Sequence, residues 1–195
     1  MQRVVMLSVS VAIVAWGASA FADSPNLKGD YGFIENDWCI YAGDFTAPPT
    51  FEALTNGPSE SHAVSGTFTF NGDGTGTATQ TSLAATRGGG FTGNGGAEAS
   101  TSSFPFTYTV NGDGTWNLVT ILLQTGTFTA GPRTGQTFTI THSPAGLSGQ
   151  ISQNAMMLTL ANQTPRVQTL TFQDGTKEFR ICTTTRVFIA LPKGQ

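Results

Sequence analysis

Short runs of alternating apolar and polar side chains follow one another along almost the whole chain after residue 23, and this pattern constrains the fold most. The clearest runs, 65–70, 104–110 and 137–141, alternate Phe, Tyr, Val or Ile with Thr, Ser, Gly or Pro. Successive side chains of a β-strand point to opposite faces, so these runs predict strands with one buried face and one solvated face. No stretch has the apolar stripe and end caps of a helix. The pattern therefore predicts an all-β protein.

The turns between these runs share a short sequence motif. Residues 71–75 and 111–115 both have the sequence Asn-Gly-Asp-Gly-Thr, and residues 174–176 repeat the last three residues of that motif. Asn-Gly and Asp-Gly supply the positive φ angles that tight hairpins need. We therefore predict three antiparallel hairpins, over 64–83, 104–124 and 166–191.

The first 22 residues have the three-part layout of a secretory signal peptide. Arg3 is followed by a largely apolar stretch over 4–16 and by mostly small residues over 17–22. The apolar stretch is shorter than the roughly 20 residues that a membrane-spanning helix needs. Cleavage after Ala20 and after Ala22 both fit the small-x-small rule, and the second leaves an acidic start. We expect an exported protein, periplasmic or extracellular, with no membrane span in the mature chain.

Export would place the two cysteines, Cys39 and Cys182, in an oxidising compartment where disulfides persist. Two cysteines allow a single pairing. The alternatives are two free thiols or half of a metal site, but the chain has no CxxC spacing and only two histidines, His62 and His142. We predict a disulfide between Cys39 and Cys182, joining the start of the mature chain to its end.

A single domain over 23–195 is long enough for about 8–10 short antiparallel strands. Such a set has two economical packings, a closed barrel or a two-sheet sandwich. The predicted disulfide would bring the first and last strands together, and those strands are neighbours in an up-and-down barrel. We therefore predict an antiparallel up-and-down β-barrel, with the two-sheet β-sandwich as the alternative.

Two regions interrupt the alternation. Residues 43–61 contain three prolines and are interpreted as an extended loop. Residues 86–103 include a Gly-rich stretch with little to bury, which indicates a loop that could act as a lid over a cavity. This stretch does not match a phosphate-binding loop, because no Gly-Lys-Ser/Thr sequence ends it and no helix is expected to follow it.

Residues 27–33, Leu-Lys-Gly-Asp-Tyr-Gly-Phe, resemble the Gly-x-Trp strand that opens a lipocalin barrel, with Tyr31 in place of the Trp. In lipocalins an Arg near the last strand packs over that aromatic ring, so the resemblance implies that Arg180 or Arg186 covers Tyr31. The middle lipocalin motif, Thr-Asp-x-x-Tyr, is absent. The opening is also similar to that of small secreted bacterial proteins of unassigned function. The resemblance supports a barrel and names no ligand.

Charge and composition exclude several functions. Nine Lys and Arg against twelve Asp and Glu give a net charge of −3, which disfavours nucleic acid as a partner. The chain has no HExxH motif, and two isolated histidines make a poor zinc site. The motif at 71–75 superficially resembles the start of an EF-hand calcium-binding loop, but Ser82 occupies the twelfth position, where that loop requires Glu. We expect no metal and no cofactor.

Several residues carry reactive groups, but the sequence assigns none of them to a chemical site. Residues 59–62, Ser-Glu-Ser-His, gather a hydroxyl, an acid and an imidazole, but sequence neighbours seldom form a catalytic unit and we interpret them as a polar loop. Glu35, Asp37 and Asp44 are candidate paired carboxylates for sugar cleavage, although nothing in the sequence shows them facing one another.

Trp38 and Trp116 could stack on a flat ligand, but packing in the core is the commoner role for aromatic side chains. His142 lies at the end of an alternating run, where a surface turn is expected.

Three functions remain, and the sequence assigns no catalytic or ligand-binding residue to any of them. The first is a barrel that binds a small apolar ligand in a hollow interior. The second is a structural or surface-interaction domain with a filled core. The third is a hydrolase, which would need a cleft holding acidic residues with shifted pKa values.

Overall fold

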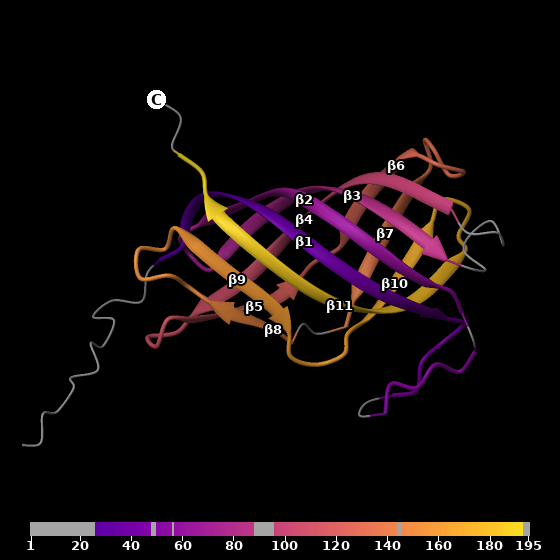
Figure 1. The fold of residues 1–195 in the computed structure, drawn as a ribbon, viewed down its shortest axis with the longest axis horizontal. Coiled ribbons are helices and arrows are strands. Elements are labelled where there is room, and N and C mark those ends of the chain that lie inside the picture. The colour runs from indigo at the N-terminus through magenta and orange to yellow at the C-terminus, as the bar shows by residue number, and fades with distance from the viewer. Residues whose placement is uncertain (1–25, 48–49, 56, 88–95, 144–145, 193–195) are drawn as a thin grey trace, which may run out of the picture.

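The computed structural model describes residues 26–192 except 48–49, 56, 88–95 and 144–145, so the predicted signal peptide lies outside the described residues. Within that part of the chain there is no helix, and eleven strands form one antiparallel sheet (Figure 1). The predicted all-β, antiparallel class is confirmed. The strands are β1 (Lys28–Ala42), β2 (Ser59–Asn71), β3 (Thr75–Arg87), β4 (Gly96–Val110), β5 (Thr115–Ile121), β6 (Gln124–Ala130), β7 (Thr137–His142), β8 (Leu147–Gln150), β9 (Met157–Asn162), β10 (Val167–Phe172) and β11 (Lys177–Ala190).

The sheet closes on itself, because β1 pairs with β2 on one side and with β11 on the other. The long strands β1, β2, β3, β4 and β11 run obliquely around a shared interior (Figure 1). Eight strands make the closed ring, which runs through β1, β2, β3, β4, β6, β7, β10 and β11 and back to β1. The first and last strands are therefore neighbours, as predicted, and the described strands belong to one sheet rather than to the two of a sandwich.

The strand order departs from a simple up-and-down sequence, and the described strands number eleven rather than 8–10. The cause is that β4 and β11 each pair, along one edge, with two shorter strands in succession. β4 pairs with β6 over residues 99–103 and with β5 over 106–110. β11 pairs with β10 over residues 177–181 and with β9 over 185–189. Two sets of short strands therefore bridge β4 and β11, namely β5, β8 and β9 toward one end of the ring and β6, β7 and β10 toward the other.

The three predicted hairpins are present as β2–β3, β4–β5 and β10–β11. In each turn the Asp side chain accepts hydrogen bonds from the backbone N–H and the hydroxyl of the Thr two residues later, at 2.9 and 2.6 Å. The intervening Gly has a φ of 82° to 87°. These turns comprise Asp73, Gly74 and Thr75, then Asp113, Gly114 and Thr115, then Asp174, Gly175 and Thr176.

The second turn offers a matched pair of glycines. Gly114 has a φ of +82°, whereas Gly112 has no positive φ and a Cβ added there would meet nothing within 4 Å. We expect Gly114→Ala to lower the free energy of unfolding by about 1 kcal/mol, because L residues are strained at positive φ. Gly112→Ala should be neutral or slightly stabilising. Urea denaturation of both variants is the measurement, and equal losses would contradict this account of the turn.

The predicted loops are shorter than expected. β3 continues to Arg87 and β4 begins at Gly96, so residues 86–87 and 96–103 of the expected Gly-rich loop are strand, and residues 88–95 lie outside the described residues. β2 begins at Ser59, so residues 59–62 belong to a strand and not to a polar loop. In both places the inward side chains are polar like the outward ones. The alternation of apolar and polar residues that predicts a strand is therefore missing from the sequence there.

The interior of the ring is divided along its length. At one end the inward side chains form a buried aromatic and aliphatic cluster, here called the aromatic half. At the other end, here called the charged half, ionisable side chains lie opposite a smaller apolar cluster from β6, β7 and β10. Each long strand crosses the boundary: on β2 Glu60 and His62 give way to Phe68 and Phe70, on β4 Glu98 gives way to Phe104 and Phe106, and on β11 Arg180 and Arg186 give way to Phe188.

The aromatic half is filled by its own rings. Phe68 is fully buried and its ring centre lies 5.0 Å from Phe33, 4.9 Å from Phe106 and 5.1 Å from Phe188. Trp116 is also fully buried and donates its Nε1–H to the carbonyl of Thr159 at 2.8 Å. Its predicted role as a core aromatic is therefore confirmed. Trp38 instead points outward and is 52 % exposed.

The predicted disulfide between Cys39 and Cys182 is present. The two residues are direct partners in the register of β1 and β11, so the covalent bond lies across the seam that closes the ring. It joins positions 143 residues apart in the chain.

We expect the double variant Cys39→Ala/Cys182→Ala to lose about 3–5 kcal/mol of unfolding free energy, because the bond closes a very long loop in the unfolded chain. Urea denaturation with and without a reducing agent measures this. Reduction should destabilise the wild type and leave the double variant unchanged. A wild type insensitive to reduction would show that strand pairing alone determines its stability.

Candidate functional site

Nine of the 21 charged side chains of this protein lie inside the ring, within the part of the chain that the structure describes. Four of the nine Lys and Arg residues do so, and five of the twelve acidic residues. Ions removed from water must be paired or hydrogen-bonded, so this concentration identifies a candidate site. The residues are Glu35, Asp37, Glu60, Glu98 and Glu178 together with Arg133, Arg166, Arg180 and Arg186.

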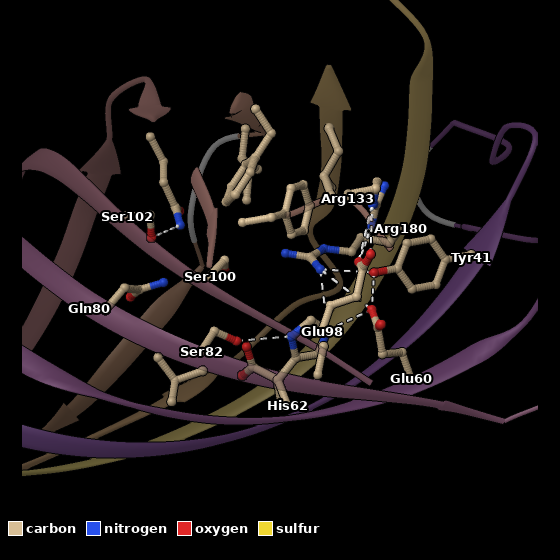
Figure 2. Close-up of a pocket in the computed structure, with 18 residues that line it drawn as sticks. Tyr41, Glu60, His62, Gln80, Ser82, Glu98, Ser100, Ser102, Arg133 and Arg180 are labelled. Carbon is tan, nitrogen blue, oxygen red and sulfur yellow. Dashed lines mark hydrogen bonds and ion pairs between the residues drawn. The ribbon is translucent and has the colours of Figure 1, made fainter. Parts of the chain in front are cut away.

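A cavity of about 60 Å³ opens among these side chains (Figure 2). One wall is polar and comes from β1, β2, β3, β4 and β11, while the opposite wall is apolar and comes from β6, β7 and β10. This volume is small beside the 300–1,000 Å³ of pockets for drug-sized ligands. The polar wall includes Asp37, Tyr41, Glu60, His62, Gln80, Ser82, Glu98, Ser100, Ser102 and Arg180, and the apolar wall includes Phe128, Phe138, Ile140 and Leu170.

Glu60 is the centre of the polar wall. Its carboxylate accepts hydrogen bonds from the Tyr41 hydroxyl and, at 2.7 Å, from the Thr86 hydroxyl, and lies 3.0 Å from His62 Nε2. Burial alone would raise the pKa of Glu60, but the hydrogen bonds from His62, Tyr41 and Thr86 outweigh it and lower the pKa to about 2. Glu60 is therefore ionised at neutral pH.

His62 stands between this carboxylate and a hydroxyl. Its Nε2 faces Glu60, and its Nδ1 lies 3.3 Å from Ser82 Oγ. Burial, followed by the charge of Arg180, lowers the pKa of His62, so the ring is neutral at neutral pH. The tautomer that donates Nε2–H to Glu60 leaves Nδ1 as an acceptor for the Ser82 hydroxyl.

Arg180 crosses the cavity beside this pair. Its Nε donates to Gln168 Oε1 at 2.7 Å and its Nη1 donates to the Tyr41 hydroxyl at 2.9 Å. The same Nη1 lies 4.0 Å from Glu60 Oε2. Burial and the neighbouring Glu60 raise the pKa of Tyr41, so its hydroxyl stays protonated and able to donate.

Arg133 closes the apolar wall. It forms an ion pair with Glu98, with Nη2 2.6 Å from Oε2, and its guanidinium lies 4.3 and 4.2 Å from the ring centres of Phe128 and Phe172. Glu178 approaches Arg133 at 4.0 Å, but burial raises its pKa to about 7. Glu178 is therefore partly protonated at neutral pH.

A second group of charges lies between the cavity and the aromatic half. Arg186 donates to Glu35. Burial alone would raise the pKa of Glu35, but the charge and hydrogen bond of Arg186, the hydrogen bond with Asp37 and the charge of Arg166 together outweigh it and lower the pKa. Burial and the adjacent Glu35 raise the pKa of Asp37 well above its usual range, which favours a neutral carboxyl. Arg166 is only 2 % exposed, and neither its Nε nor its Nη1 has a hydrogen-bond partner among the described residues.

Positive charge is therefore in excess in this interior. Four arginines face three carboxylates that are lowered in pKa or ion-paired, namely Glu35, Glu60 and Glu98, while the other two, Asp37 and Glu178, are raised in pKa. The pKa of His142 reflects the same excess of positive charge. Burial, followed by the charges of Arg166, Arg180 and Arg186, lowers this pKa to about 2.

The predicted site residues are only partly brought together. Glu35 and Asp37 are adjacent in the interior, whereas Asp44 is exposed. Glu60 and His62 face the cavity, and His142 faces the interior from β7 rather than lying in a surface turn.

The arginine contacts differ from those implied by the lipocalin resemblance. Arg186 lies over the rings of Phe33 and Phe68, and Arg180 lies over Tyr41. The hydroxyl of Tyr31 instead donates to the carbonyl of Ala155.

Sequence reasoning missed Glu98, Arg133, Arg166 and Glu178. Glu98 and Glu178 could have been found from the alternation along their strands, because each lies an even number of residues from the buried positions of the same strand. Arg133 and Arg166 lie outside the strands, and no local pattern marks them.

No protein-family model matches this chain, and no curated protein or solved structure matches it. Within the described part of the chain, no three or more His, Cys, Asp or Glu side chains are grouped so as to hold a metal ion. Over the same residues, no helix has the length and apolar character that crossing a membrane requires.

His142 makes stability depend on pH with a definite sign. In an unfolded chain a histidine binds its proton near pH 6.5, whereas the pKa of folded His142 is about 2. Below pH 6.5 the unfolded state therefore binds more protons, and this residue lowers the free energy of unfolding as the pH falls from 6.5 toward 2. His62 acts in the same direction, while Asp37 and Glu178, whose pKa values are raised, act in the opposite one.

We expect His142→Gln to remove the contribution of His142 to the pH dependence of the unfolding free energy. Relative to wild type, the variant should gain roughly 2 kcal/mol of unfolding free energy between pH 7 and pH 4.5, because one proton-binding site of the unfolded state is lost. Urea denaturation of both proteins at several pH values gives the difference curve, in which the other ionisable groups cancel. A difference that stays constant over this range would contradict the buried, neutral state of His142.

Proposed function

We propose that this protein is a binding module for a small organic anion, with a short carboxylate as the ligand. The observation that carries the proposal is the excess of buried positive charge: Arg133 and Arg180 line the cavity, and Arg166 and Arg186 are buried without lining it and act electrostatically on Asp37, which does line it. Buried positive charge that is not fully compensated favours a ligand of opposite charge.

The two walls of the cavity indicate the shape of this ligand. Arg180 presents a cation on the polar wall, which suits a carboxylate because charge-assisted hydrogen bonds are the strong ones. Phe138, Ile140 and Leu170 line the opposite wall and suit a short hydrocarbon body. A cavity of about 60 Å³ favours a ligand of few heavy atoms.

The same layout favours a polar ligand over a purely apolar one. The aromatic half, where an apolar ligand would be expected, is occupied by rings such as Phe68 and Trp116, which are fully buried. The open space lies instead among ionisable side chains. The filled aromatic half then acts as the rigid base of the site.

We also propose that the protein is exported and works outside the cytoplasm. The disulfide between Cys39 and Cys182 supports this, because disulfides persist mainly in oxidising compartments.

The test is calorimetric titration with acetate, propionate and butyrate, and with the matching neutral amides. We expect binding of a carboxylate and none of its amide. Arg180→Gln should weaken this binding at least about tenfold, because it removes a charged hydrogen-bond donor. Lys177→Gln, which removes one positive charge from an exposed position of the same strand, is the matched control and should bind as wild type does.

Equal affinity for the acids and their amides would refute recognition of an anion. An equal loss in both variants would show a general electrostatic effect and not a site at Arg180. Intact thermal unfolding of each variant shows that any loss of binding is not a loss of fold.

A further inference from the structure

Three side chains on the polar wall form a hydrogen-bonded series that anion binding does not require. Ser82 Oγ lies 3.3 Å from His62 Nδ1, and Nε2 of the same ring lies 3.0 Å from Glu60 Oε2. Figure 2 shows the three side chains together at the cavity, with the dashed contact between Ser82 and His62. A hydroxyl, an imidazole and a carboxylate in this order make up the arrangement that activates a serine.

The register of two neighbouring strands produces this arrangement. On β2, Glu60 and His62 are two residues apart and share the inward face. On β3, Ser82 lies opposite Val64, so it is the diagonal neighbour of His62 on that face. All three positions lie on paired strands rather than on a loop, which holds their geometry tightly.

The electrostatic state of the series is also suitable. In the tautomer that directs Nε2–H to Glu60, the neutral ring of His62 keeps a lone pair on Nδ1 for the Ser82 proton. Arg180 Nη1, 3.3 Å from the same Nε2, acts as a neighbouring cation. Glu60 is ionised and would stabilise the imidazolium that forms when that proton moves. Thr86 donates to the other oxygen of Glu60 at 2.7 Å and so fixes the orientation of the carboxylate.

We propose that Ser82 is the nucleophile of an acyl-transfer site that hydrolyses small carboxylic esters, with His62 as general base and Glu60 as the positioning residue.

In the first step Ser82 Oγ bonds to the ester carbonyl carbon, the carbonyl π pair moves to oxygen, and the Oγ proton passes to His62 Nδ1. When the tetrahedral species collapses, the bond to the alcohol oxygen breaks and that oxygen takes the proton from His62. Water then attacks the acyl-Ser82, giving its proton to His62. Collapse returns this proton to Ser82 and releases the carboxylic acid, so atoms and charge balance with water as the only co-reactant.

The cavity limits the substrate. A volume of about 60 Å³ accommodates a short acyl group such as acetyl and excludes a long chain. Gln80, two residues from Ser82 on the same inward face of β3, brings an amide to this wall. Its Oε1 has no hydrogen-bond partner among the described residues.

Methanesulfonyl fluoride tests the nucleophile directly, because it is about as small as the acyl group that the cavity accommodates and forms a stable sulfonyl ester with an activated serine as fluoride leaves. After incubation of the full protein, mass spectrometry of the intact chain and of its peptides should show one adduct, on Ser82. Ser82→Ala and His62→Gln should not be labelled. Ser61→Ala removes an exposed serine that points outward from β2 between Glu60 and His62, and it should be labelled as wild type is.

Hydrolysis of p-nitrophenyl acetate tests the assigned roles. We expect Ser82→Ala and His62→Gln to lower kcat by about 10²-fold or more. Glu60→Gln should lower kcat while KM stays near the wild-type value, since Glu60 acts through His62 and does not touch the substrate. A change in KM alone, with unfolding midpoints unaltered, would contradict the positioning role.

Absence of an adduct on folded wild-type protein at millimolar probe would overturn the proposal, and so would equal labelling of His62→Gln. This outcome is distinct from failure of the binding proposal. Wild-type protein that binds a short carboxylate but forms no adduct would overturn the nucleophile alone, and wild-type protein that forms the adduct but binds no carboxylate would overturn the binding proposal alone.

Discussion

The pairing of β1 with β11 is the interaction on which the rest of the structure depends. It runs from Tyr31 opposite Ala190 to Ala42 opposite Phe179, and it converts a sheet with two edges into a closed ring. Closure removes every second side chain of the long strands from bulk water, whatever its polarity. The disulfide between β1 and β11 lies within this pairing, so the covalent bond and the hydrogen-bonded seam oppose the same opening motion.

Closure has opposite energetic consequences in the two halves of the interior. Each fully buried Phe of the aromatic half, such as Phe68 or Phe188, contributes roughly 2 kcal/mol of transfer free energy. Each ion in the charged half costs several kcal/mol of lost hydration, which ion pairs such as Glu98 with Arg133 offset only in part. Stability therefore resides mainly in the aromatic half. The charged half lowers stability, a cost that the proposed anion site would account for.

The same division explains what could be predicted from the sequence. Where inward residues are aromatic, as along 104–110, the period of two is visible and strands and hairpins were predicted correctly. Where the inward residues are also polar, as at Glu60 and His62, both faces of the strand look alike and the strand was interpreted as a loop. The site could not be assembled from the sequence, because only the register of paired strands makes Ser82 a neighbour of His62.

The two proposed activities are chemically connected through this geometry. Hydrolysis of a short ester at Ser82 produces a short carboxylate, and it does so in a cavity where Arg180 supplies a cation. Stronger binding of that anion would slow its release, so the affinity for a carboxylate and the turnover of an ester would oppose each other in one cavity. Arg180 is tied by hydrogen bonds to Gln168 and Tyr41, and it cannot withdraw from the cavity without breaking both. In such a site retention of the product, rather than bond cleavage, would set the rate.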